Sequence, residues 1–317
     1  IINFKKKHCY MKKDDIFKGV FPVLPTTFLE NQELDLDSQK RAIDCVIDQG
    51  ADGLCILANY SEQFLLSDEE RNTLLKVCLK HVGQRIPVIV TCSHYSSHVV
   101  IERAKMAKSM GADMIMLMPP YHGSELIGDE TAVFEQLSIV SDQVDIPLML
   151  QDATLSGVHL SSTFLGKLLD TIPNTSYLKI EVPDTAEKIA SLVSHNGKYF
   201  RGAFDGENAI TLLPNLKAGA IGTMPSALLS ELLKPILANF FSGNTVKAEE
   251  MFNHVLPLIN YELYQCGIQA AKIVMKEGKV INSDIVRHPL TPTRPEARRE
   301  ILRLAKHYDL LALKWGK

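Results

Sequence analysis

Lys179 is the residue whose type and setting best fit covalent chemistry. It interrupts the apolar run Tyr177–Glu181, whereas almost all other lysines of the sequence fall in helical patterns or loops. Burial strips water from an ammonium group and favours the neutral amine, and a neutral amine can condense with a ketone to form a Schiff base. Glu181 follows two residues later, so the two side chains should share one face of a strand. A structural Lys–Glu ion pair is the alternative, and the pair alone leaves both interpretations open.

A polar turn follows another apolar run, Gly53–Leu57. Asn59, Tyr60 and Ser61 stand at its end. Their side chains and the backbone N–H groups of the turn could bind a carboxylate through several hydrogen bonds, without an arginine. The alternative is an ordinary polar turn, and the motif alone does not decide between the two.

An aromatic hydroxyl follows a third run, Asp113–Met118. Tyr121 and His122 come directly after Pro119 and Pro120, which stiffen the loop. Tyr121 could donate a proton or fill the wall of a site, and on its own the motif favours the wall.

The sequence contains no recognisable metal or nucleotide motif. His94 and His98 have the i, i+4 spacing of two ligands on one helix face, but neither the Glu of H-E-x-x-H nor a cysteine or carboxylate cluster accompanies them. The patterns G-x-G-x-x-G, G-x-x-x-x-G-K-[ST] and G-x-S-x-G are also missing. We therefore expect no metal and no nucleotide cofactor.

The elements that position these residues alternate regularly along the chain. Eight short apolar runs predict buried parallel strands: Val20–Leu24, Gly53–Leu57, Pro87–Thr91, Asp113–Met118, Ile146–Leu150, Tyr177–Glu181, Tyr199–Phe204 and Gly219–Thr223. Amphipathic helical patterns follow each run, and the pattern after the seventh run covers Glu207–Lys217. Eight alternations without a turn-rich linker favour a closed (β/α)8 TIM barrel over two doubly wound halves. In such a barrel the chemistry lies at the carboxyl ends of the strands.

Residues 19–240 are therefore expected to form the barrel, and residues 241–317 a C-terminal helical extension. The extension contains three helical patterns, Thr245–Gln265, Gly267–Glu277 and Pro295–His307. Residues 1–18 form an N-terminal arm. Its first part, Ile1–Tyr10, precedes Met11 and lacks a signal-peptide apolar region, so we expect leader or vector-derived sequence there.

The composition indicates a folded, soluble, cytoplasmic protein. The 317 residues carry 34 Lys+Arg against 37 Asp+Glu, a net charge of −3, so neither nucleic acid nor an anionic membrane surface is expected as a partner. No run approaches the roughly 20 apolar residues of a membrane helix. The six cysteines are scattered without C-x-x-C spacing, so we expect reduced thiols.

Together, the strand-six lysine, the polar turn ending in Glu62 and the Pro-x-Tyr after strand four resemble the dihydrodipicolinate synthase / N-acetylneuraminate lyase superfamily. The resemblance runs from Gly19 to the C-terminus. It implies a TIM barrel with a helical extension that acts on a small-molecule 2-keto acid through a lysine Schiff base. It also implies that no cofactor is needed and that the subunits form a homotetramer.

Several blocks depart from the usual pattern of the superfamily. The second-strand motif, commonly G-[ST]-T-G-E, reads A-N-Y-S-E over Ala58–Glu62, and the sixth-strand I-K-E reads K-I-E over Lys179–Glu181. After strand five, Leu150 stands where most members have a proton-shuttling tyrosine. Leu155 stands where synthases have the arginine that holds a second substrate. These changes count against dihydrodipicolinate synthesis and leave Glu181 as the carboxyl that strand geometry places nearest the lysine.

The altered blocks, with Pro119–Gly123 and Gln151–Ala153, are similar to a branch of the superfamily that dehydrates 2-keto-3-deoxy sugar acids. This implies L-2-keto-3-deoxyarabonate as the substrate, and 2,5-dioxopentanoate and water as the products. It implies catalytic roles for Lys179, Glu181 and Tyr121. The residues implied in substrate binding are Asn59, Tyr60, Ser61, Gln151, Gly206, Glu207 and Thr223.

Two other classes of function stay open. A pyruvate-forming 2-keto-3-deoxy acid aldolase, or an enzyme like dihydrodipicolinate synthase, would use the same enamine on the same scaffold. A non-catalytic sugar-acid-binding protein would keep the carboxylate turn with an inert Lys179, and the fold alone does not exclude it.

Overall fold

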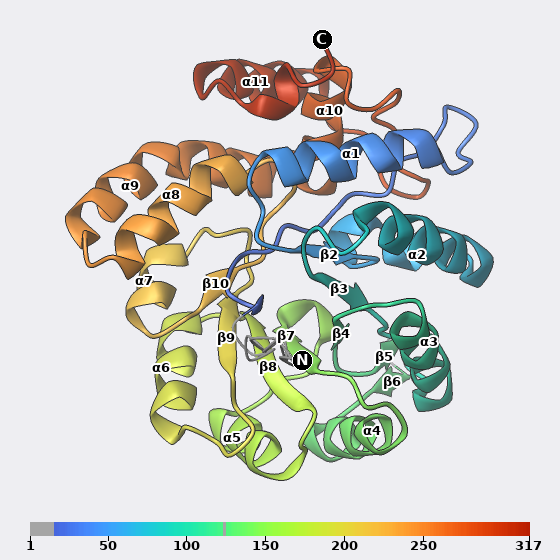
Figure 1. Ribbon diagram of the computed structural model, residues 1–317, viewed down its shortest axis with the longest axis vertical. Coiled ribbons are helices and arrows are strands. Elements are labelled where there is room, and N and C mark those ends of the chain that lie inside the picture. The colour runs from blue at the N-terminus through green and yellow to red at the C-terminus, as the bar shows by residue number, and fades with distance from the viewer. Residues whose placement is uncertain (1–15, 123–124) are drawn as a thin grey trace, which may run out of the picture.

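Eight short strands form a single parallel sheet (Figure 1). The computed structural model describes residues 16–122 and 125–317. The strands are β1 (Gly19–Val20), β2 (Leu54–Ile56), β3 (Val88–Thr91), β4 (Met114–Leu117), β7 (Leu148–Ala153), β8 (Thr175–Glu181), β9 (Gly202–Asp205) and β10 (Gly222–Thr223). Their order in the sheet is β1-β10-β9-β8-β7-β4-β3-β2. A parallel bridge between Val23 and Cys55 joins the chain after β1 to β2, so the sheet closes on itself as a barrel.

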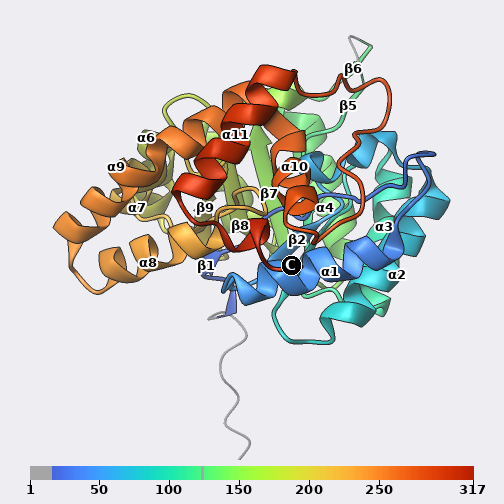
Figure 2. The same cartoon turned by 90° about the horizontal axis from the view of Figure 1, so that it is seen from above.

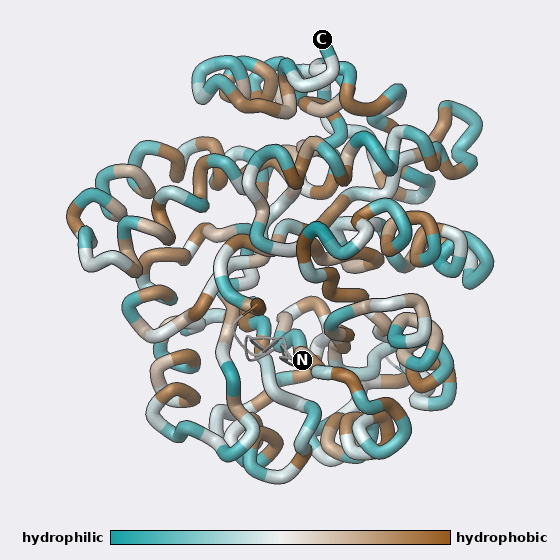
Figure 3. The backbone as a smooth tube through the Cα atoms, viewed as in Figure 1, coloured by the Kyte–Doolittle hydropathy of each residue, from teal (hydrophilic) through white to brown (hydrophobic). Residues whose placement is uncertain are grey.

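Helices alternate with the strands, as predicted, and lie around them (Figure 1). They are α1 (Leu36–Asp48), α2 (Asp68–Val82), α3 (Ser97–Ser109), α4 (Glu130–Gln143), α5 (Ser162–Thr171), α6 (Thr185–His195), α7 (Leu212–Lys217) and α8 (Ser230–Phe241). Hydrophobic and hydrophilic residues alternate along them in Figure 3, as amphipathic helices require. Local sequence sets the start of α2, where the Ser67 hydroxyl accepts from the Glu70 N–H and the Glu70 carboxylate accepts from the Ser67 N–H.

Several element boundaries differ from the sequence expectation, and two of these differences lie at the carboxyl ends of strands and affect the site. Strand β7 continues to Ala153, so Gln151 belongs to the strand and not to a following loop. The last helix before β10 begins at Leu212 instead of Glu207, because Asn208 and Ala209 adopt left-handed backbone conformations with φ of 51° and 66°. A right-handed helix cannot include such residues.

Alternation along the strands separates two apolar clusters. Inside the barrel, Tyr177 of β8 packs with Phe204 of β9 and other buried side chains, whereas Leu178 belongs to the larger cluster between strands and helices. Side chains two residues apart share a strand face. Lys179 and Glu181 therefore continue the inner row that Tyr177 begins, toward the carboxyl end of the barrel.

Three further helices follow the barrel along one side (Figures 1 and 2): α9 (Thr245–Tyr261), α10 (Ala270–Glu277) and α11 (Pro295–His307). A π-helical turn, Glu262–Cys266, follows α9. Lys272 of α10 forms an ion pair with Glu62, and both side chains are 0% exposed. The Arg287 N–H donates to the second Glu62 oxygen at 2.8 Å. These contacts tie the C-terminal helices to the turn after β2.

A short hairpin, β5 (Tyr121–His122) and β6 (Leu126–Ile127), follows β4, and the sequence patterns did not indicate it. The five cysteines that the structure describes are free, while Cys9, Gly123 and residues 1–15 of the expected arm lie outside the described residues. Within the described ranges, no helix combines the length and apolarity needed to cross a bilayer.

Candidate active site

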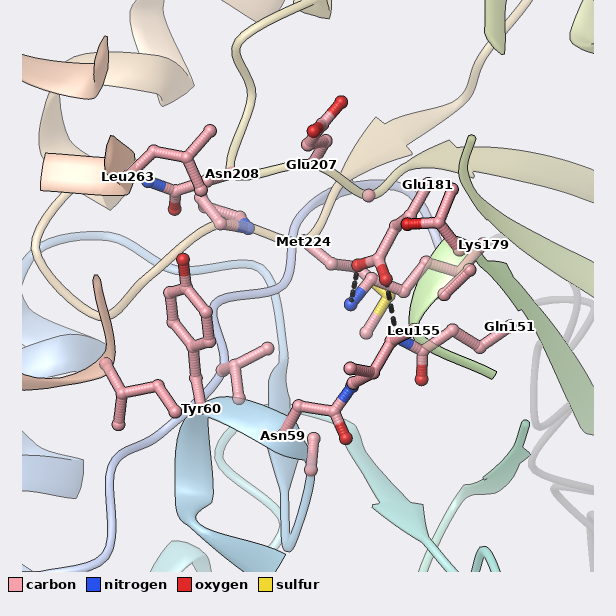
Figure 4. Close-up of a pocket in the computed structure, with 17 residues that line it drawn as sticks. Asn59, Tyr60, Gln151, Leu155, Lys179, Glu181, Glu207, Asn208, Met224 and Leu263 are labelled. Atoms are coloured by element: carbon pink, nitrogen blue, oxygen red, sulfur yellow. Dashed lines mark hydrogen bonds and ion pairs between the residues drawn. The ribbon is translucent and has the colours of Figure 1, made fainter. Parts of the chain in front are cut away.

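A cavity of about 260 Å³ opens at the carboxyl ends of the strands (Figure 4). Its polar lining consists of Asn59, Tyr60, Gln151, Thr154, Lys179, Glu181, Glu207 and Asn208. Its apolar lining includes Val23, Ala58, Leu155, Met224, Leu263 and Ile268. Among these described residues Lys179 is the only cation. This is the end of a TIM barrel at which catalysis takes place in characterised enzymes of the fold.

Lys179, Glu181 and Gln151 form a connected group inside this cavity. The Lys179 ammonium lies 2.6 Å from Glu181 Oε1, with side-chain exposures of 5% and 17%. The Gln151 amide donates to Glu181 Oε2 at 2.7 Å, and β7 and β8 pair Gln151 directly with Lys179. Each carboxylate oxygen therefore has a fixed partner (Figure 4). The side-chain amide oxygen of Gln151, Oε1, is buried without a hydrogen-bond partner in the described protein, so it can accept a hydrogen bond from a ligand hydroxyl.

Gly206 has no side chain, and this makes room for the Glu181 side chain. A Cβ at this position would lie 2.3 Å from Glu181 Cγ and 2.9 Å from the Ile180 carbonyl oxygen. No side chain fits at such a distance without displacing the carboxylate. The glycine after β9 is thus required by the close approach of Glu181.

The turn after β2 contributes Asn59 and Tyr60 to the cavity, but not Ser61. The Ser61 hydroxyl donates to the Leu24 carbonyl at 2.6 Å and accepts from the Ala58 N–H at 3.1 Å, so it holds the turn in shape. Asn59 Oδ1 accepts from the Gln63 amide at 2.7 Å. Among the residues that the structure describes, the one partner of its Nδ2 is Met118 Sδ, at 3.5 Å, which leaves a donor for a ligand.

Thr223 and Tyr121 lie outside this lining. The Thr223 hydroxyl donates to the buried Asp205 carboxylate at 2.6 Å. Burial raises the pKa of Asp205, against the opposing effect of its hydrogen bonds. Tyr121 lines a neighbouring cavity together with His94, and its ring packs against Phe64.

Glu207 adds a second carboxyl to the lining. Burial and the nearby negative charge of Glu181 raise the pKa of Glu207. In the view of Figure 4 its carboxylate points away from Lys179. Glu207 thus lies at the rim of the site, while Glu181 lies at its centre.

The structure adds residues that sequence reasoning missed. Asn208 lines the cavity beside Glu207, and its amide contacts the fully buried Glu262 of the π-helical turn at 3.3 Å. Leu263 and Ile268 also reach the cavity from beyond the barrel. Glu262 falls within a long helical pattern, where no local signal distinguishes it from a surface glutamate.

A model of the dihydrodipicolinate synthetase family matches residues 16–308. The chain belongs to this family. It is 47% identical over 299 residues to L-2-keto-3-deoxyarabonate dehydratase of Azospirillum brasilense, covering 94% of this chain and 97% of that protein. It is 25% identical over 285 residues to 4-hydroxy-tetrahydrodipicolinate synthase 1 of Halalkalibacterium halodurans, covering 89% and 94% of the two chains.

Solved structures of the dihydrodipicolinate synthase family have the same fold. The dihydrodipicolinate synthase of Thermotoga maritima superposes with a TM-score of 0.85 at 21% identity, over 93% of this chain and 99% of that one. The predictions of the barrel and of the family are therefore confirmed. No group of three or more His, Cys, Asp or Glu side chains in the described part of this family member could hold a metal ion.

Proposed function

We propose that this protein dehydrates L-2-keto-3-deoxyarabonate to 2,5-dioxopentanoate through a Schiff base on Lys179. The observation that carries the proposal is a buried lysine in the cavity, 2.6 Å from a carboxylate that is itself held by Gln151. The 47% identity with the dehydratase from Azospirillum brasilense across 94% of the chain supports the substrate and the reaction class.

The Glu181 contact supplies the free amine. Transfer of a proton from the Lys179 ammonium to Glu181 across 2.6 Å leaves a neutral nitrogen that attacks the C2 ketone. Glu181 returns the proton to the carbonyl oxygen, which leaves as water, and the products are a protonated imine and the Glu181 carboxylate. This imine withdraws electrons from C3 and so acidifies the C3 protons.

The same carboxyl then carries the elimination. Glu181 removes a proton from C3 to give an enamine, and the enamine expels the C4 hydroxyl, which leaves as water with the proton from Glu181. Loss of a C5 proton yields a dienamine with an enol at C5. Loss of the enol proton and uptake of protons at C4 and C3 then give the terminal aldehyde and restore the imine. Hydrolysis of the imine then releases the product and restores Lys179.

The binding residues follow from the cavity lining. Asn59 and the backbone of Tyr60 are proposed to hold the C1 carboxylate, and Gln151 to accept a hydrogen bond from a substrate hydroxyl. Gly206 and Glu207 line the same space. Direct roles for Ser61, Thr223 and Tyr121 stay predictions, because these side chains lie outside the lining.

Product analysis tests the reaction. Purified protein with L-2-keto-3-deoxyarabonate should release a five-carbon dicarbonyl, identified by mass spectrometry, and the Lys179→Ala variant should release none. Pyruvate among the products would instead establish the aldolase. Ligand-induced thermal stabilisation without any product would favour a sugar-acid-binding protein.

The broader organisation is proposed on the same basis. Residues 19–240 form the catalytic barrel and residues 241–317 a C-terminal helical extension, and the protein acts in the cytoplasm as a homotetramer. Exposed aromatic side chains at Phe64 and Tyr95 support contacts between subunits. Sedimentation velocity tests the assembly, since a species of one chain would contradict it.

A further inference from the structure

Tyr60 contributes a polar side chain to the cavity. Its ring crosses the cavity from the turn after β2 and points toward Asn208 and Leu263, away from Gln151 (Figure 4). Within residues 16–122 and 125–317, no protein group forms a hydrogen bond with its hydroxyl. A phenol that borders a cavity without a protein partner is available to a ligand.

The surroundings keep this phenol protonated. Burial raises the pKa of Tyr60, and the charges of Glu262, Glu181 and Glu207 raise it further. Glu262 is held in place by the Ser226 hydroxyl and the Asn208 amide. Tyr60 therefore presents a neutral O–H, which can donate one hydrogen bond to a ligand oxygen and does not act as a base.

The position of the phenol relative to Lys179 defines which end of a ligand it can reach. A 2-keto acid bonded through C2 to Lys179 has C1 on one side and the remaining carbons on the other. The proposed carboxylate site uses Asn59 and the backbone of Tyr60, near the start of the Tyr60 side chain. The hydroxyl lies at the far end of that side chain, on the side of Asn208 and Leu263 (Figure 4), so it would face the distal carbons of such a ligand.

We infer that the Tyr60 hydroxyl hydrogen-bonds the terminal C5 oxygen of the substrate and so determines specificity for a five-carbon acid with a terminal hydroxyl. This inference rests on the proposed function and extends it to the far end of the substrate. Gln151 and Glu181 are left to contact the C4 hydroxyl. Leu155 and Leu263 enclose the site with apolar surface, so an unpaired hydroxyl there would be unfavourable.

The same contact suits the later steps of the reaction. The C5 oxygen changes from an alcohol to an enol and then to an aldehyde, which has no proton of its own and accepts hydrogen bonds. A neutral phenol donates to it without any net proton transfer. Tyr60 is thus a specificity-determining contact, and Glu181 remains the acid–base group.

A comparison of two enzymes on two substrates, analogous to a double-mutant cycle, tests the contact. Wild type and Tyr60→Phe are compared on L-2-keto-3-deoxyarabonate and on 2-keto-4-hydroxypentanoate of the same C4 configuration, which lacks the terminal hydroxyl. Removing the phenol should lower kcat/KM about 10- to 100-fold for the first substrate and less than about 2-fold for the second. Equal losses on both substrates, or no loss on either, would overturn the inference.

Controls separate this inference from the proposed function. Tyr264→Phe removes a hydroxyl from an exposed tyrosine outside the cavity and should leave both rates unchanged. Borohydride reduction with pyruvate should still modify Lys179 in Tyr60→Phe, because pyruvate has no distal carbons. Failure of the wild type to dehydrate L-2-keto-3-deoxyarabonate would contradict the proposed function, whereas an active wild type whose substrate preference Tyr60→Phe does not change would contradict only the role of Tyr60.

Discussion

Two buried lysine–glutamate pairs in this protein have similar chemistry and different surroundings. Lys179 and Glu181 border the cavity, with side-chain exposures of 5% and 17%. Lys272 and Glu62 are both 0% exposed, and neither lines the cavity. Lys272 also donates to the Ile285 carbonyl at 2.9 Å and lies over the Phe28 ring at 4.6 Å. One lysine can therefore meet a ligand, and the other is enclosed by protein.

The difference shows that pairing alone does not make a lysine catalytic. Burial lowers the pKa of Lys272, and Glu62 opposes that shift, yet the Lys272 side chain is 0% exposed, so a ketone has no access to this amine. A reactive lysine needs both a proton acceptor and an adjoining cavity. Only Lys179 has both among the two pairs, so activity should depend on one pair and stability on the other.

The largest expected effect is on catalysis at the first pair. Lys179→Met should lower turnover by at least about 10⁴-fold, because no imine can form. Its loss of stability should be smaller than that of Lys272→Met, since Glu181 keeps its hydrogen bond from Gln151. Turnover assays and thermal melts on both variants measure this. Substantial dehydration by Lys179→Met would contradict the claim that activity depends on the Lys179–Glu181 pair.

Glu181→Gln should separate the formation of the imine from the dehydration that follows it. The variant keeps Lys179 but lacks its proton acceptor, so the reducible adduct with pyruvate should form more slowly yet reach the same final yield, while dehydration falls about 10²- to 10⁴-fold through loss of the acid–base group. Adduct yield by mass spectrometry and product release are measured on the same sample. Equal loss of both quantities would show that the carboxyl serves the imine step only.

Lys272→Met should affect stability instead of chemistry. Removal of one partner leaves Glu62 buried without its cation, at a cost of about 3–5 kcal/mol. The double variant Glu62→Gln/Lys272→Met should recover part of this loss. Denaturant unfolding gives the free energies, and folded protein should still form the Lys179 adduct. A single variant as stable as the wild type would contradict a structural role for the pair.

Gly206→Ala should disturb the first pair from outside it. The added Cβ would lie 2.3 Å from Glu181 Cγ, so the carboxylate must shift, and we expect kcat to fall about 10- to 100-fold with the Lys179 adduct retained. Gly166→Ala is the control, because the atoms nearest its Cβ would belong to the partly exposed His195 ring, at 3.2 Å. Unchanged kcat in Gly206→Ala would show that the position of Glu181 is not critical.

A further buried glutamate, Glu262, has no lysine partner among the residues that the structure describes, and its substitution should change only the pH dependence of stability. Burial raises its pKa from 4.5 to about 7. The folded protein then binds this proton more tightly than the unfolded chain. The free energy of unfolding therefore falls as pH rises from 4.5 to about 7, by about 3 kcal/mol in total. Glu262→Gln should lose less stability between about pH 5 and about pH 8 than the wild type. If the free energy of unfolding changed by the same amount between the two pH values in both proteins, the result would contradict this.

The sequence was sufficient to predict the features that local pattern determines. A charged residue within an apolar strand can be found in the sequence without knowledge of its contacts, so Lys179 and Glu181 could be named as candidates. The eight strand–helix alternations predicted the barrel. The extent of the site depended on longer-range contacts. Glu62 was visible only as part of a turn, because its partner Lys272 lies 210 residues away, and the left-handed backbone at Asn208 replaced a helix that the pattern favoured.

The most direct measurement is the identity of the lysine that borohydride reduction labels. Wild-type protein is incubated with L-2-keto-3-deoxyarabonate or pyruvate, reduced, digested and analysed by mass spectrometry. The adduct should lie on the peptide that contains Lys179, and the peptide that contains Lys272 should stay unmodified. An adduct on Lys272 or on any other lysine, or no adduct on an active enzyme, would contradict the assignment of Lys179 as the Schiff-base residue.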